Sequence, residues 1–165
     1  MVYYLRLLAS AAIIFSEAPS LAAPGASVQV KVRAQVIKPL ILTSTQNIDF
    51  GTILMTNVTA ANVVSISGSG AITCGAGLTC SATGKPAIFN VSGSNKQVVT
   101  ITSAATNISN GTTNLPFTPS APASVTLTNS GATGIDFNVG GSFSVDQNTT
   151  DGVYTGILSV TVDYQ

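Results

Sequence analysis

The sequence predicts an all-β protein, an immunoglobulin-like antiparallel β-sandwich, and three observations carry this prediction. Apolar residues alternate with polar residues along many short segments, as they do in strands with one buried face. No stretch repeats apolar residues at helical spacing over more than two turns. Gly, Pro, Asn and Ser separate the alternating segments, as turn residues do. A closed barrel is the alternative that the same pattern allows.

The N-terminal residues are typical of an export signal. Arg6 precedes an apolar run, Leu7 to Phe15, which is too short to cross a bilayer. Pro19 follows, and small residues at the expected positions predict cleavage after Ala22. We therefore expect residues 1–22 to be a signal peptide and the chain to be exported.

The composition excludes the common catalytic chemistries. Charged residues make up 7% of the chain, and its formal net charge is zero. Arg6 and Glu17 leave with the signal peptide, so the exported chain keeps five basic residues and five aspartates but no His, Glu or Trp. Acid–base catalysis, catalytic triads and most transition-metal sites need His or paired carboxylates. We expect no catalytic residue, metal, cofactor or small-molecule substrate and, because no basic run occurs, no nucleic-acid partner.

Ten segments alternate strongly enough to be predicted strands. They are residues 28–36, 40–43, 47–50, 63–67, 87–92, 97–102, 124–129, 135–139, 142–146 and 154–164. Gly-Ser-Gly at 68–70, Asn-Gly at 110–111 and Asp-Gly at 151–152 are among the turns between them. The sequence thus divides into the signal peptide, an N-terminal extension over 23–38 and a β-sandwich domain over 39–165.

The first predicted strand, SVQVKVRAQV, has the cleanest alternation in the sequence. One face carries the apolar residues Val28, Val30, Val32, Ala34 and Val36, and the other carries Gln29, Lys31, Arg33 and Gln35. Pro39 then ends regular pairing and separates this strand from the domain. Such a strand can pair within its own chain or be lent to another chain, and the sequence leaves both open.

Two cysteines, Cys74 and Cys80, lie close together in the segment CGAGLTC. This spacing in an exported chain predicts one local disulfide, with free thiols as the alternative. A ring this small contributes about 2 kcal/mol by the loop-entropy argument. We expect the bond to restrain one loop rather than to hold the fold together.

The C-terminal segment, GVYTGILSVTVDYQ, contains the last predicted strand. Its two faces separate by parity, with Tyr154, Gly156, Leu158, Val160, Val162 and Tyr164 on one and Thr155, Ile157, Ser159, Thr161, Asp163 and Gln165 on the other. Parity alone predicts a core strand that turns its apolar face inward and runs to the last residue.

This ending resembles that of bacterial pilins assembled by the chaperone–usher route. Their last strand alternates apolar residues, carries an aromatic residue at the penultimate position and has a glycine fourteen residues from the end, as Tyr164 and Gly152 do here. The segments NIDFG (47–51), IFNVSG (88–93) and FNVGGSFSV (137–145) are also similar to a family of small secreted bacterial domains of unknown function, itself similar to the archaic, spore-coat-U-like pilins.

The resemblance implies an incomplete sandwich that lacks one strand. A periplasmic chaperone would complete it first, and the apolar face of residues 28–36 from another copy would then replace the chaperone by strand addition. The edge of the gap would be formed by Gly152, Tyr154, Leu158, Val160, Val162 and Tyr164. An outer-membrane usher would be a further partner, and the product would be a fimbria on the surface of a Gram-negative bacterium.

Two other functions stay open from the sequence. A self-contained secreted sandwich would pair residues 28–36 within its own chain and would bind a glycan or a protein. A hydrolase would need paired aspartates, and no two of the five share a recognisable motif. We therefore expect a structural subunit rather than an enzyme.

Overall fold

The computed structural model describes residues 25–81, 84–129, 131 and 133–165. The predicted signal peptide, with its cleavage site after Ala22, lies outside the described residues. The chain divides into two units, Met1–Ala34 and Gln35–Gln165. The strands all belong to the second unit, and no described residue is part of a helix that could span a membrane.

The described residues form twelve strands and no helix, so the all-β prediction is confirmed. The strands are β1 (Ile41–Gln46), β2 (Ile53–Met55), β3 (Asn62–Ile66), β4 (Ile72–Cys74), β5 (Leu78–Cys80), β6 (Ala87–Ser92), β7 (Val98–Ser103), β8 (Thr106–Ser109), β9 (Asn114–Ser120), β10 (Ser124–Thr126), β11 (Ile135–Val145) and β12 (Val160–Tyr164). Every pairing between them is antiparallel.

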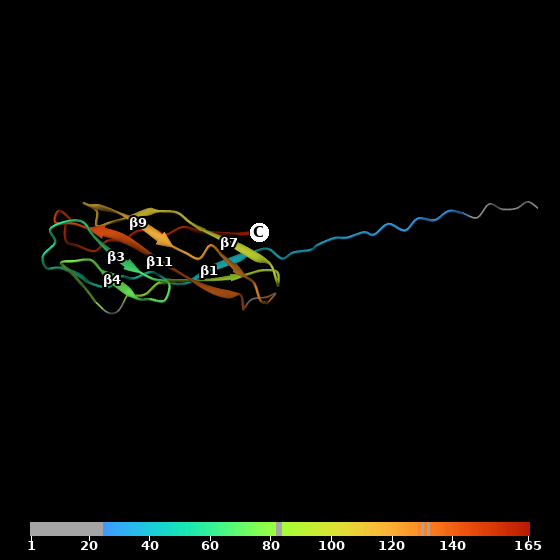
Figure 1. The fold of residues 1–165 in the computed structure, drawn as a ribbon, viewed down its shortest axis with the longest axis horizontal. Coiled ribbons are helices and arrows are strands. Elements are labelled where there is room, and N and C mark those ends of the chain that lie inside the picture. Colours follow the sequence, from blue (N-terminus) through green and yellow to red (C-terminus); the bar gives the residue numbers. More distant parts are fainter. Residues whose placement is uncertain (1–24, 82–83, 130, 132) are drawn as a thin grey trace, which may run out of the picture. The chain divides into compact units, whose positions relative to one another are not determined.

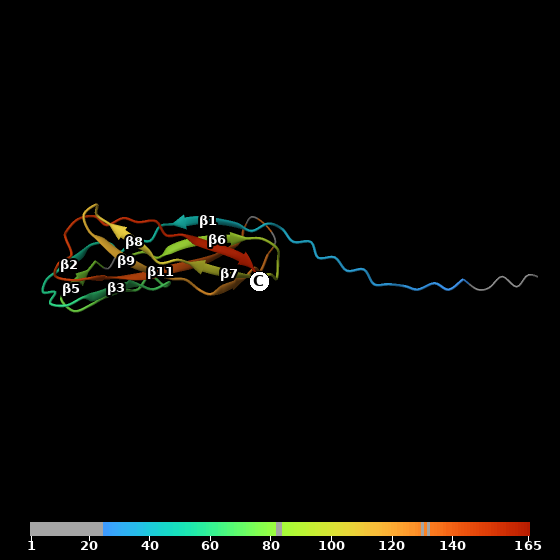
Figure 2. The ribbon, with the colours of Figure 1, turned by 90° about the horizontal axis from the view of Figure 1, so that it is seen from above.

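The strands build the two layers of a β-sandwich. One layer is a seven-stranded sheet with the order β1-β6-β11-β3-β4, in which β9 pairs with both β11 and β8. The other layer consists of the three-stranded sheet β10-β7-β12 and the two-stranded sheet β2-β5. Figure 1 shows β3, β4, β9 and β11 of the larger sheet, and Figure 2 shows the domain from above with β12 beside β7.

Two apolar clusters fill the space between the layers. The first lies between β6, β7 and β11, and its buried members are Ala87, Phe89, Val91, Val99, Ile101, Leu127, Phe137 and Val139. The second lies on β3, β9 and β11 of the seven-stranded sheet, and its buried members are Val64, Leu115, Phe117, Phe143 and Val145. Leu158 packs against both clusters and therefore marks the place where they meet.

A single long strand, β11, replaces the two strands predicted over 135–139 and 142–146. Its first half pairs with β6, and its second half pairs with β3 and β9. The two predicted segments are separated by Gly140 and Gly141, and in the structure these glycines allow close packing instead of a break. A Cβ atom at Gly140 would collide with the Ile66 carbonyl, and one at Gly141 would collide with the Phe117 ring.

Five strands were not predicted, namely β2, β4, β5, β8 and β9. The longest of them, β9, contains Pro116 and Pro119, and proline is disfavoured inside a sheet. Pro116 is paired with β8 only and Pro119 with β11 only, so each proline has an open edge where its missing N–H costs little. The other four strands have three or four residues each, which is too short for alternation to be recognised.

Four predicted strands are shorter than expected or not formed. The strand predicted over 124–129 ends at Thr126. Residues 25–40 contain no strand, turn or bend, so the segment 28–36 is not a strand in the single chain. The prediction over 47–50 reduces to one bridge between Asp49 and Lys85. The last strand begins at Val160 instead of Tyr154, with one earlier bridge at Thr155. Each of these segments has an alternating sequence but lacks a neighbouring strand along its length, and a strand needs such a neighbour for its hydrogen bonds.

Candidate functional site

A groove of about 1160 Å³ opens between the two layers of the domain. One wall is formed by the end of β1 and residues 46–55, and the other is formed by residues 149–158. We call this feature the open groove. A pocket for a small molecule typically encloses about 300–1,000 Å³, and the volume of the open groove lies just above this range. Each wall is a run of consecutive residues, so the groove suits a bound segment of chain.

Core side chains form the floor of the open groove. The floor residues are Ala87, Phe89, Thr106, Ile108, Leu115, Phe117, Phe143 and Val145, from β6, β8, β9 and β11. Phe50 from the first wall packs edge-on against the Phe143 ring, with ring centroids 4.9 Å apart, and against the Phe117 ring at 6.0 Å. The groove therefore opens directly onto the second apolar cluster.

The second wall begins at a corner that is held by Asn110. The Asn110 amide nitrogen donates to Thr150 Oγ1 (2.9 Å) and to the Asp151 carbonyl (3.0 Å). Gly152 follows with φ +132°, a conformation that side chains rarely allow. Tyr154 then donates its hydroxyl to the Thr150 carbonyl (2.7 Å). These contacts fix the direction in which the C-terminal segment enters the wall.

The predicted gap-edge residues divide into two groups. Gly152, Tyr154 and Leu158 line the open groove. Three others, Val160, Val162 and Tyr164, do not line it, and they pack against the first apolar cluster. The inward-facing residues Tyr154, Leu158, Val160, Val162 and Tyr164 are half-buried and Gly156 is exposed, while the opposite face is exposed throughout.

Both walls carry unpaired edges. β1, whose end forms part of the first wall, is the end strand of the seven-stranded sheet. The second wall continues into β12, which is the end strand of the three-stranded sheet. Between Thr155 and β12, the backbone of residues 156–158 makes no hydrogen bond within the described part of the chain. An edge with free N–H and C=O groups is a template for another strand.

The side chain of Tyr164 connects the end of the domain to its beginning. Its hydroxyl donates to the Lys38 carbonyl (2.7 Å) and accepts from the Ser94 N–H (2.8 Å). Ser94 Oγ in turn accepts from the Lys38 N–H (2.6 Å). We call these three hydrogen bonds the Tyr164 clasp. It holds the point at which the N-terminal extension joins the domain.

The extension itself leaves its apolar face in solvent. Val28, Val30, Val32 and Val36 are 80–93% exposed, and Ala34 is also exposed. The polar face of the same segment carries Lys31 and Arg33. Two lining residues of the open groove, Asp49 and Asp151, have the opposite charge.

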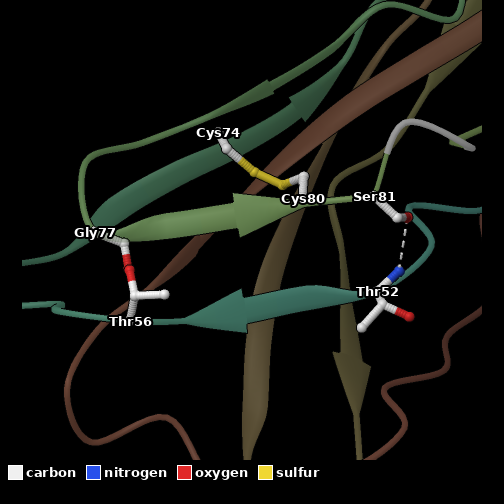
Figure 3. Close-up of a disulfide and its surroundings, with 6 residues drawn as sticks. All are labelled: Thr52, Thr56, Cys74, Gly77, Cys80 and Ser81. Carbon is white, nitrogen blue, oxygen red and sulfur yellow. Dashed lines mark hydrogen bonds between the residues drawn. A yellow bond between two sulfur atoms is a disulfide. The ribbon is translucent and has the colours of Figure 1, made fainter.

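The predicted disulfide joins Cys74 to Cys80 and is confirmed. Their Cα atoms lie 6.1 Å apart, and the bond connects the last strand of the seven-stranded sheet to β5 (Figure 3). β5 pairs with β2, which belongs to the first wall of the groove. Figure 3 also shows Thr56 donating to the Gly77 carbonyl and the Thr52 N–H donating to Ser81 Oγ, contacts that hold the two ends of this β2–β5 pair.

Several residues of the open groove are not among those that the sequence predicts for the site. Ile108, Leu115 and Phe117 form much of the floor, but they lie on the unpredicted strands β8 and β9. The alternation of Leu115 and Phe117 was a usable signal, which the intervening Pro116 obscured. The sequence predicts Asn110 to lie in an Asn-Gly turn, but this motif does not predict its hydrogen bonds to Thr150 and Asp151. Within the described ranges, no group of three or more His, Cys, Asp or Glu side chains is placed to hold a metal ion.

Comparison with known proteins gives one match. The family described as Domain of unknown function (DUF4402) matches residues 40–164, which include every strand and both walls of the open groove. No curated protein and no solved structure matches the chain.

Proposed function

The chain belongs to the DUF4402 family of domains of unknown function, and from the open groove we propose that it is a structural subunit of a surface fimbria. In this proposal the subunits polymerise by donor-strand exchange. The N-terminal extension of one copy fills the groove of the next. The observation that carries the proposal is the open groove itself, whose apolar floor lies between two unpaired strand edges.

An open groove of this kind is unfavourable in a free subunit. The floor residues Phe117 and Phe143 are buried, but apolar side chains of the walls are exposed to solvent. These are Leu54, Met55, Val153 and Ile157. Exposed apolar patches and free strand edges mark sites of association. A strand inserted between the two walls would cover exposed apolar surface and pair with both edges, so it would remove both costs at once.

The N-terminal extension has the properties required of that strand. Its four valines and Ala34 repeat at the spacing of one strand face. Their transfer from solvent into the groove contributes about 6–10 kcal/mol before the entropy of ordering is subtracted. Lys31 and Arg33 stay on the opposite face, where they complement Asp49 and Asp151 at the groove. Each new backbone hydrogen bond adds about 1 kcal/mol.

The mode of contact determines the shape of the product. Each copy donates its extension to one neighbour and accepts the extension of another neighbour, so donor and acceptor surfaces differ. Contacts of this head-to-tail kind do not close on themselves unless a ring forms, and they build a fibre. The fibre subunit needs no catalytic chemistry, and we propose no enzymatic activity.

The same reasoning supplies the partners and the compartment. Before polymerisation a periplasmic chaperone would occupy the groove by strand addition, and an outer-membrane usher would pass the subunit to the cell surface of a Gram-negative bacterium. The disulfide between Cys74 and Cys80 supports an oxidising compartment.

A single charge on the apolar face of the extension tests the proposal. We expect Val32→Asp to weaken self-association of the exported chain at least about hundredfold, because an unpaired carboxylate would have to enter the apolar groove. Gln35→Asp is the matched control, since it adds the same charge to the solvent face of the same segment. Sedimentation velocity over a concentration series measures the association.

The outcomes separate the proposal from its alternative. If Val32→Asp and the unaltered chain assemble equally well, the extension is not the donor and the proposal fails. If the unaltered chain stays monomeric at all concentrations, the result favours a self-contained module that binds a glycan or a protein.

A further inference from the structure

We propose that Tyr164 determines which groove the extension enters, by directing it into the groove of another copy and away from the groove of its own chain. The inference rests on the proposed function, because it concerns the partner of the same open groove. Its basis is the Tyr164 clasp and the chemistry of the residues on either side of it.

The clasp occupies both backbone groups of one residue at the base of the extension. The Lys38 N–H is bound by Ser94 Oγ, and the Lys38 carbonyl is bound by the Tyr164 hydroxyl. Gly93 provides the room for this arrangement, since a Cβ atom there would collide with the Tyr164 hydroxyl. Lys38 is therefore fixed to the domain immediately before β1 begins.

Insertion into the same chain's groove requires the backbone to reverse between Val36 and β1. The structure contains no turn or bend over residues 35–40. A turn with Lys38 and Pro39 at its centre would place proline at the third position, where it is disfavoured in the common turn types.

A turn that begins at Lys38 is the favourable way to reverse the chain, because it puts Pro39 at the second position. Its closing hydrogen bond would run from the Ile41 N–H to the Lys38 carbonyl. That carbonyl already accepts the Tyr164 hydroxyl. A carbonyl oxygen can accept two hydrogen bonds, but the clasp holds this one toward Tyr164, and the residues around it form no turn. The reversal would have to direct the same carbonyl toward the Ile41 N–H, so the clasp opposes the reversal and favours an extension that pairs with a second copy.

The test removes the clasp from the full exported chain. Tyr164→Phe deletes the hydroxyl that binds Lys38 and Ser94, and Ser94→Ala deletes the acceptor of the Lys38 N–H. Ser69→Ala is the matched control, because it removes a hydroxyl that hydrogen-bonds to Ser67, away from the clasp and from the lining of the open groove. Native mass spectrometry separates monomers from oligomers, and hydrogen exchange on each species measures protection of the amides of residues 28–36.

In the unaltered chain, we expect these amides to exchange freely in monomers and to be protected in oligomers. Tyr164→Phe and Ser94→Ala should each produce a self-closed monomer in which the same amides are protected. For Tyr164→Phe, which loses two hydrogen bonds, the self-closed share should rise roughly tenfold. Ser69→Ala should behave as the unaltered chain does.

Three results would overturn the inference. In the first, neither clasp variant forms a monomer with protected amides over residues 28–36, while the same amides stay protected in the oligomers. This result would leave the proposed function intact. In the second, the unaltered monomer already has a protected extension, so the groove is filled in cis. In the third, the extension is unprotected in every species, and the proposed function fails with the inference. Exchange in β6 and β11 monitors the fold, so a variant that only loosens the domain is recognised.

Discussion

At Gly156 the C-terminal segment passes so close to β8 that a side chain does not fit. A Cβ atom there would lie 2.6 Å from the Asn107 carbonyl oxygen and 2.9 Å from Ile108 Cγ2. We expect Gly156→Ala to lower the free energy of unfolding by about 1–3 kcal/mol, because the segment must move away from β8 and break its bridge at Thr155. Urea unfolding measures the change.

The control for this prediction is Gly131→Ala. An added Cβ atom at Gly131 has no neighbouring atom within 4 Å, so the substitution should change stability by less than about 0.5 kcal/mol. Equal stability of the two variants would show that the segment does not need to approach β8 closely.

Asn110 uses its side-chain amide for two separate tasks. The oxygen accepts from the N–H groups of Thr112 and Thr113, and the nitrogen donates to Thr150 and Asp151. Asn110→Asp keeps the acceptor and loses the donor, so we expect a loss of about 1–2 kcal/mol that is confined to the corner of the second wall. Hydrogen exchange of residues 150–155 should rise in this variant, while exchange in β6 stays unchanged. A uniform rise throughout the domain would contradict the role of Asn110 as a local holder of the corner.

Among the elements, the β2–β5 pair depends most on a covalent bond. The Cys74–Cys80 disulfide, with a sequence separation of 6, ties this pair to the seven-stranded sheet. Replacing both cysteines by serine should lower the free energy of unfolding by about 2 kcal/mol. Exchange in β2 and β5 should increase more than exchange in β11. Reduction of the unaltered chain should have the same effect, whereas reductant should not affect the serine variant. Loss of the whole fold would contradict a local role for the bond.

At the level of the whole molecule, we expect a strand bound in the open groove to stabilise the entire domain. The full Val32→Asp chain offers an open groove that its own extension cannot fill well. We expect a peptide of residues 25–38 to bind this groove and to raise the free energy of unfolding by about 2.7 kcal/mol at a peptide concentration about 100-fold above Kd. Thermal unfolding measures this as a rise in Tm.

The same peptide with Val32→Asp is the control for the groove. It has the same length and the same polar face, so it should raise Tm far less if the apolar face makes the contact. Equal effects of both peptides would indicate binding to another surface. That outcome would remove the basis for polymerisation through the groove.

The class of the fold and much of its local structure follow from the amino-acid sequence alone. Alternation predicts both ends of β6 and the half-buried face of the C-terminal segment. It does so because alternation along a strand and burial of one strand face are local properties. The spacing of Cys74 and Cys80 identified the disulfide for the same reason.

Where the strands pair, and where they leave a gap, depends on contacts between distant parts of the chain. β9 is a strand despite Pro116 and Pro119 because β8 and β11 supply its partners, and β11 is continuous because Gly140 and Gly141 admit close neighbours. The floor of the open groove and the Tyr164 clasp join residues that are far apart in the chain. Such contacts depend on which strands meet in space, and no alternating pattern specifies that choice.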